Sequence, residues 1–164
     1  MNTPYMSVPV AVDALIAKEG QEIGVTRWFH MNQDRINAFA DATEDWYYIH
    51  TNPEKAAAET PWGGTIAHGF LTASLLSAMA YDVIPPIEGV AHGVNYGFDK
   101  LRFVSPVPTG SNVRGRFTLS KADMTKPGEI TLTYGVTVEI EGQEVANGGR
   151  PALAADWIAR QFFE

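Results

Sequence analysis

The segment Glu129–Ile140 constrains the fold of this chain most strongly. Apolar side chains stand at every second position and polar side chains at most positions between them; the apolar set is Ile130, Leu132, Tyr134, Val136, Val138 and Ile140. This alternation is typical of a β-strand that turns one face toward a hydrophobic core. A sheet that contains such a strand needs a second apolar layer to cover that face.

A helix over residues 68–82 is predicted to be that layer, because the stretch is mostly apolar and Pro85-Pro86 prevents its continuation. Further strands are expected over residues 22–31, 89–104, 112–124 and 143–156, and a second helix over residues 33–42. Long strands joined by short turns favour antiparallel pairing. The predicted fold class is therefore α+β, with one antiparallel sheet that curls around a single helix.

The length of 164 residues and the apolar content of 45% fit one compact domain that spans residues 1–164. The sequence contains neither an internal repeat nor a linker rich in proline, glycine and serine. Residues 1–20 are expected to be loosely ordered, apart from a short helix over residues 12–18.

The charge balance, with 12 Lys and Arg against 19 Asp and Glu, argues against a partner that is a nucleic acid or a membrane surface. The absence of cysteine excludes disulfides, thiolate metal sites and cysteine nucleophiles, and it agrees with a cytoplasmic protein. We also expect neither a signal peptide nor a membrane span, because no apolar run reaches the required length.

The first segment whose side chains could take part in catalysis runs from Asp45 to His50. A spacing of five residues suits neither one face of a helix nor one face of a strand, so the two side chains meet only if the backbone bends. In that case the carboxylate and the imidazole would form a general acid–base pair. The simpler alternative is a surface loop that holds a hydrogen-bonded histidine.

The second segment is Ile66-Ala67-His68-Gly69-Phe70, which follows a glycine turn and opens the predicted buried helix. Unpaired amides at a helix start stabilise negative charge, and Gly69 lacks a Cβ, so a substrate carbonyl could approach its N–H. The simpler alternative is a helix start that packs tightly. Ser77, inside this helix, is expected to be structural or to support an acid–base residue.

Other catalytic patterns have little support. The sequence has no G-x-S-x-G elbow of a serine hydrolase and no H-x-x-x-H metal-ligand spacing. Lys100 and Arg102 share one strand face, as do Arg114 and Arg116. If residues 106–110 form a hairpin, these four side chains would gather into a phosphate-binding patch; a solvated face or a subunit contact is the alternative.

The two segments occur in an order that resembles the MaoC-like dehydratases, the family of (R)-specific enoyl-CoA hydratases, and especially its nodulation-protein-N-like branch. The family pattern is an Asp-x-Asn-Pro-x-His run followed about twenty residues later by Ile-Ala-His-Gly. Here the run reads Asp45-Trp46-Tyr47-Tyr48-Ile49-His50, so Tyr47 and Tyr48 replace the Asn-Pro pair. The likeness continues through residues 94–103, 105–108 and 150–152.

The resemblance implies a hot-dog fold, in which an antiparallel sheet wraps around one long helix. It also implies hydration of a trans-2-enoyl-CoA to a (3R)-hydroxyacyl-CoA, or the reverse dehydration. Asp45 would activate water, His50 would hold that water, the Gly69 amide would polarise the thioester carbonyl, and Ser77 would support them. Substrate contacts are expected from Trp46, Tyr47, Tyr48, Ile66, His68, Phe70, Asn95, Lys100 and Arg102.

The same resemblance implies a homodimer or a multiple of dimers, with acyl-CoA as the small-molecule partner. No metal and no organic cofactor are expected, since CoA would be part of the substrate. Two alternatives stay open at this point. One is a hot-dog thioesterase, and the other is a non-catalytic subunit that binds acyl thioesters.

Overall fold

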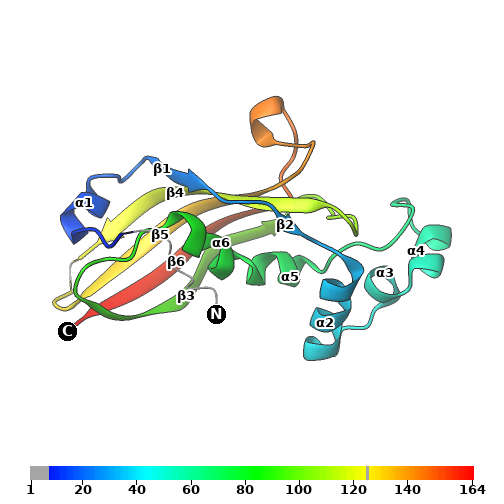
Figure 1. The fold of residues 1–164 in the computed structure, drawn as a ribbon, viewed down its shortest axis with the longest axis horizontal. Helices are drawn as coiled ribbons and strands as arrows, with labels where there is room; N and C mark the ends of the chain where they lie inside the picture. The colour runs from blue at the N-terminus through cyan, green and yellow to red at the C-terminus, as the bar shows by residue number, and fades with distance from the viewer. Residues whose placement is uncertain (1–7, 125) are drawn as a thin grey trace.

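A computed structural model describes residues 8–124 and 126–164 of the chain (Figure 1). Its elements fall into an N-terminal part with most of the helices and a C-terminal part with most of the strands. In chain order they are α1 (Val12–Ile16), β1 (Glu22–Val25), β2 (Phe29–His30), α2 (Gln33–Thr43), α3 (Tyr48–Thr51), α4 (Pro53–Glu59), α5 (Gly69–Ser74), α6 (Leu76–Val83), β3 (Val90–Phe103), β4 (Asn112–Asp123), β5 (Glu129–Ile140), η1 (Val145–Asn147) and β6 (Leu153–Phe163).

The strands form one antiparallel sheet in the order β1-β4-β5-β6-β3, and β2 pairs with β4 beside β1. Strand β5 lies at the centre, where Tyr134 is opposite Leu119 on β4 and Trp157 on β6. All six apolar side chains predicted for one face of β5 are buried. The alternation in the sequence is confirmed because that face packs on the core.

Helices α5 and α6 cover this face of the sheet, as Figure 1 shows, so the predicted α+β arrangement with a central helix is confirmed. The helix is interrupted at Leu75, which caps both segments, rather than continuous over residues 68–82. Leu76 and Met79 of α6 enter the core against Phe117 of β4. Burial of such side chains supplies the main driving force for this packing.

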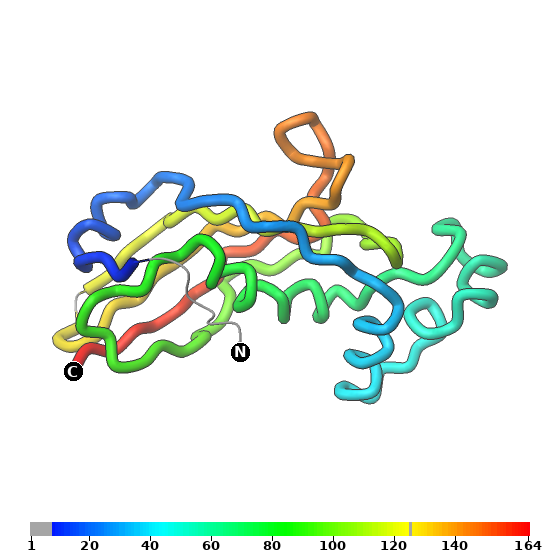
Figure 2. Tube along the Cα trace, viewed as in Figure 1, coloured from blue at the N-terminus to red at the C-terminus, as the bar shows by residue number. Residues whose placement is uncertain are grey.

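Helices α2, α3 and α4 extend beyond the end of the sheet, at the right of Figures 1 and 2. Asn32 caps α2 by accepting a hydrogen bond from the Arg35 amide, and Asn52 caps α4 in the same way from the Lys55 amide. We call residues 33–64 the projecting segment. It brings the run from Asp45 to His50 next to the start of α5.

Several predicted boundaries differ from the structure; the strand expected over residues 22–31, for example, is divided into β1 and β2. Leu15 of α1 is buried in the core and Val10 pairs with Ile87, so these contacts attach part of residues 8–20 to the sheet domain; residues 1–7 lie outside the described residues. The last strand begins at Leu153 rather than at residue 143. Gly142 and Gly148 have left-handed backbone angles around a 3-10 turn, which makes residues 141–152 a loop.

The predicted gathering of four basic side chains is wrong, because β3 pairs with β6 and two strands separate it from β4. Arg114 and Arg116 instead form ion pairs with the buried Glu139, and Arg116 also pairs with Glu22.

Among the residues that the structure describes, no helix has the length and the apolar character that crossing a membrane requires.

Candidate active site

A sharp bend after α2 brings the two predicted acid–base residues together. Glu44, which ends α2, has a left-handed backbone with φ of 60°. The Thr51 hydroxyl of α3 donates a hydrogen bond of 3.0 Å to the Trp46 carbonyl, which holds the loop in its bent form. One nitrogen or carboxylate oxygen from each of Asp45, His50 and His68 lies within 4.8 Å of the other two. The predicted convergence of Asp45 and His50 is thus present.

The imidazole of His50 has a defined orientation. Its Nδ1 lies 2.7 Å from the Ile66 carbonyl oxygen, and since a carbonyl can only accept, Nδ1 carries the proton. The lone pair of Nε2 is then free to accept a proton or a hydrogen bond. Burial, the largest cause, lowers the pKa of His50 below its ordinary value, and the neighbouring His68 adds to this effect. The structure therefore favours a neutral imidazole.

His68 lies beneath this pair and is 2% exposed. Its ring stacks on His50 at 3.8 Å between centroids, and its Nε2 donates a hydrogen bond of 2.9 Å to the backbone carbonyl of Asp45. The Asp45 carboxylate, by contrast, remains 55% exposed. The predicted substrate contact by His68 is not supported, because other residues cover the ring.

Gly69 is the first residue of α5, where the amide has no acceptor within its own helix. A Cβ at this position would lie 2.7 Å from the Phe103 ring, so only glycine fits against that side chain. His50 and Gly69 both line a pocket of about 200 Å³. Its other lining residues are Ile66, Ala67, Thr72, Phe103, Val104, Ser105, Pro106, Val107 and Ala152. An acid–base group and an unpaired amide therefore face one cavity.

The aromatic residues predicted to bind substrate lie in different places relative to the pocket. Phe70 is exposed and meets Phe103 edge-on at 5.3 Å, next to Gly69. Trp46 is exposed, and its indole N–H donates to Asp41, away from the pocket. Tyr47 packs edge-on against Tyr48, whose ring also contacts the Lys55 ammonium group. Of the predicted contacts, Ile66 lines the pocket itself.

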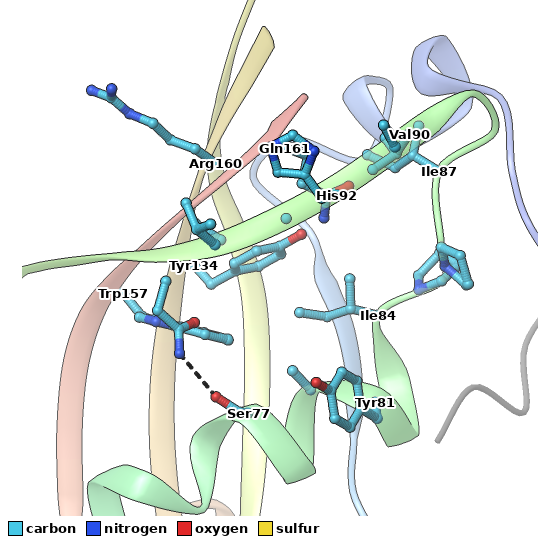
Figure 3. Close-up of a pocket in the computed structure, with 18 residues that line it drawn as sticks. Ser77, Tyr81, Ile84, Ile87, Val90, His92, Tyr134, Trp157, Arg160 and Gln161 are labelled. Carbon is cyan, nitrogen blue, oxygen red and sulfur yellow. Dashed lines mark hydrogen bonds between the residues drawn. The ribbon is translucent and has the colours of Figure 1, made fainter. Parts of the chain in front are cut away.

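Ser77 and Asn95 lie in a second pocket of about 430 Å³, between α6 and strands β3, β5 and β6 (Figure 3). The Asn95 amide donates a hydrogen bond of 3.1 Å to the Ser77 hydroxyl. Ser77 is eight residues beyond Gly69 along the helix, or about 12 Å. The structure thus does not place Ser77 beside Asp45 and His50 within one chain.

Lys100 and Arg102 lie on β3, at the edge of the sheet. Lys100 is 3.5 Å from the Asp156 carboxylate, and the Arg102 guanidinium donates to the backbone carbonyl of Leu101. Arg102 directly precedes Phe103, which contacts Gly69, but side chains of successive strand residues point to opposite faces of the sheet, so Arg102 does not line the pocket.

The group of Asp45, His50 and His68 is also close enough to be considered as a metal site. The donor arrangement fits poorly, because Nε2 of His68 already donates to a carbonyl and the two imidazole planes are stacked at 26°. Ligands that share an ion point their lone pairs at one centre. The three side chains therefore do not point their lone pairs at a shared metal ion.

Sequence reasoning missed two residues that shape the site. Phe103 forms the wall opposite Gly69, and Gln33 of α2 joins α3 to the segment before α5. The Gln33 amide donates to the His50 carbonyl at 2.7 Å and accepts from the Thr65 hydroxyl at 2.6 Å. Neither contact has a local signal, since each joins residues at least seventeen positions apart.

Comparison with known proteins agrees with this architecture. The model of the MaoC like domain matches residues 15–140. Nodulation protein N of Rhizobium leguminosarum bv. viciae is 54% identical over 139 residues, which are 85% of this chain and 83% of that protein. The 3-hydroxyacyl-thioester dehydratase Z of Mycobacterium tuberculosis (strain ATCC 25618 / H37Rv) is 40% identical over 150 residues, 92% of this chain and 95% of that protein.

The fold has solved counterparts as well. The MaoC-like dehydratase from Rhodospirillum rubrum aligns with a TM-score of 0.72 at 18% identity, covering 94% of this chain and 98% of that one. The (R)-hydratase from A. caviae aligns with a TM-score of 0.64 at 24% identity, covering 85% and 95%. The hot-dog arrangement, with the antiparallel sheet around α5 and α6, is thus shared with these structures. This chain belongs to the MaoC-like dehydratase family.

Proposed function

We propose that the protein adds water to trans-2-enoyl-CoA to form (3R)-hydroxyacyl-CoA, or catalyses the reverse dehydration. Two observations carry this proposal: Asp45 lies close to a neutral His50, and His50 lines one pocket together with Gly69, whose amide opens α5. A carboxylate and an imidazole supply the proton transfers that hydration needs. A helix-start amide supplies a donor for the negative charge that develops on the thioester oxygen.

In the forward direction, a water molecule lies between the Asp45 carboxylate and Nε2 of His50. Its oxygen forms a bond to C3 of the enoyl group while one proton passes to this pair. The electrons of the double bond move onto the thioester carbonyl, where the Gly69 N–H stabilises the enolate. The pair then returns a proton to C2, so the elements of water are added and the pair is restored.

The pocket of about 430 Å³ is proposed to take the far part of the acyl chain, since it lies along the same central helix as Gly69. In this proposal Ser77 and Asn95 contact the acyl chain. Lys100 and Arg102, on the edge strand next to Phe103, would bind phosphates of CoA. Cations on flexible stems suit exposed phosphate groups.

A homodimer is part of the proposal. Strand β3 forms one edge of the sheet, and Val94, Tyr96 and Phe98 on it are exposed. An uncovered edge strand with apolar side chains is a ready surface for pairing with a second copy. Light scattering on the purified protein should give twice the chain mass of 17.9 kDa, or a multiple of that value.

Two observations separate this function from its alternatives. Hot-dog thioesterases often place a carboxylate on the central helix, but residues 69–81 contain no Asp or Glu, which counts against that alternative. A subunit that only binds acyl thioesters has no need for the oriented Nδ1–H of His50, which leaves Nε2 free for chemistry. Relatives named as dehydratases, such as the mycobacterial protein at 40% identity, also support an enzyme.

The test uses purified protein and crotonyl-CoA, with the conjugated enoyl-thioester absorbance and free thiol followed in parallel. Loss of the enoyl signal without thiol release, persisting in the presence of a chelator, is the expected result. Release of thiol would contradict hydration and support the thioesterase. Saturable binding without turnover across acyl-chain lengths would instead support the binding subunit.

A further inference from the structure

His68 occupies a position that no other residue of the site shares. It directly precedes Gly69, and its ring is buried between Phe39 of α2, at 5.0 Å, and His50 of α3, at 3.8 Å. Its backbone belongs to the start of α5, whereas its side chain contacts the projecting segment. One residue thus links the proposed oxyanion donor to both acid–base groups.

The hydrogen bond from His68 to Asp45 joins residues 23 positions apart. Nε2 of His68 lies 2.9 Å from the Asp45 backbone oxygen, which can only accept, so Nε2 carries the proton. Nδ1 of His68 is buried and has no hydrogen-bond partner among the residues that the structure describes. A second proton on this ring would therefore lack an acceptor, whereas the single proton on Nε2 is satisfied.

The contact with His68 ties the Asp45 loop to the start of α5. That loop follows the left-handed Glu44, the Thr51 hydroxyl donates to the carbonyls of Trp46 and Tyr47, and the Asp45 carboxylate accepts a hydrogen bond of 3.5 Å from the Tyr47 amide. The carbonyl of Asp45 itself is held by His68. Since catalytic groups must be held within a fraction of an ångström, loss of this anchor would misplace the carboxylate.

We propose that His68 is a positioning residue that sets Asp45 and His50 in place without touching substrate. This inference rests on the proposed hydration. The Nε2–H of His68 fixes the Asp45 loop, and its ring supports the face of His50. Because His68 is 2% exposed, we expect it to act through these neighbours and not through a contact with substrate.

Two substitutions separate the hydrogen bond from the packing. His68→Phe keeps an aromatic ring but removes the donor, whereas His68→Gln places an amide N–H near the position of Nε2. For crotonyl-CoA hydration, we expect His68→Phe to lower kcat about 100-fold with little change in KM. We expect His68→Gln to recover most of this loss. His30→Gln, at an exposed histidine paired with Asn112, is the matched control and should keep the wild-type rate.

A rise in KM alone would overturn the proposal, because it would make His68 a substrate contact. A kcat close to that of the wild type in folded His68→Phe would overturn it too, since His68 would then only stabilise the fold. Thermal unfolding of each variant shows which protein is folded.

A second measurement needs no turnover and stands even if His68→Phe does not fold. Long-range 1H–15N spectra of the wild-type imidazoles should show opposite tautomers, with the proton on Nε2 in His68 and on Nδ1 in His50. The Nδ1–H tautomer in His68 would overturn the proposal. Absence of hydration with the expected tautomers would overturn the proposed function and leave the anchor of Asp45 in place.

Discussion

The central strand β5 and the projecting segment differ in how much of their side chains is buried and in what holds them in place. In β5, six alternating apolar side chains are buried, and neighbouring strands satisfy the backbone on both sides. In the projecting segment, short helices and a left-handed residue leave Trp46, Tyr47 and the Asp45 carboxylate exposed. Hydrophobic burial determines the shape of the first region. The second region also buries Ile36 in the core, but long-range hydrogen bonds from Gln33 and His68 hold the run from Asp45 to His50. The comparison suggests that β5 serves stability and that this run serves chemistry.

The largest expected effect on stability tests the first half of this comparison. Leu132 is fully buried on β5, so Leu132→Ala removes apolar contacts and leaves a cavity. We expect the free energy of unfolding to fall by about 2–5 kcal/mol. Urea unfolding measures this loss. The turnover rate per folded molecule should stay close to that of the wild type, and a large loss of turnover would break the division between the two regions.

A smaller effect is expected at the junction of the two regions. Gly69→Ala places a methyl group against the Phe103 ring and shifts the start of α5. We expect hydration of crotonyl-CoA to slow about 100-fold, because the amide no longer meets the thioester oxygen. Gly64→Ala is the control, since nothing lies within 4 Å of a Cβ there. The addition of Phe103→Ala to Gly69→Ala should restore part of the rate, and no restoration would argue against this contact.

The pH dependence of stability sharpens the comparison further. Burial lowers the pKa of His50 in the folded protein below its ordinary value of 6.5, so the unfolded chain binds this proton first as pH falls. The free energy of unfolding should therefore decrease as pH drops from 6.5 through the folded-state pKa. Urea titrations at about pH 7.5 and about pH 5.5 measure this decrease. His50→Gln should show a shallower dependence, and an unchanged dependence would mean that other groups cause it.

The smallest effect is expected at the edge strand. Lys100→Ala removes an exposed ion pair with Asp156, so the free energy of unfolding should change by less than about 1 kcal/mol. If Lys100 binds phosphates of CoA, KM for crotonyl-CoA should rise and the rise should shrink as salt is added. Lys121→Ala, at another exposed ion pair, is the control. Equal KM values for the two variants would exclude Lys100 from the substrate site.

The same contrast explains what the sequence could predict. The alternation along β5 is local, so its strand and buried face were predictable from residues two positions apart. The partner of β3 was not, because strand order depends on contacts between distant segments, and the hairpin assumed for Arg102 and Arg114 does not form.

The sequence predicted which residues form the candidate site, but not which other residues hold them in position. The spacing from Asp45 to His50 required a bend, and the structure contains one. The pattern gave no sign that His68 would be buried under His50, because the same motif also suits a substrate contact. A place on the central helix likewise does not bring Ser77 near Asp45 within one chain; its hydroxyl accepts a hydrogen bond from the Asn95 amide.

We propose that Asp45 and His50 together perform the hydration, and one double variant removes both groups at once. The initial rate of crotonyl-CoA hydration should be compared between the wild type and Asp45→Asn/His50→Ala, with thermal unfolding as the check on folding. We expect a folded protein whose rate is lower by at least about 1000-fold, because positioned acid–base groups are removed. A folded double variant with wild-type activity would contradict it.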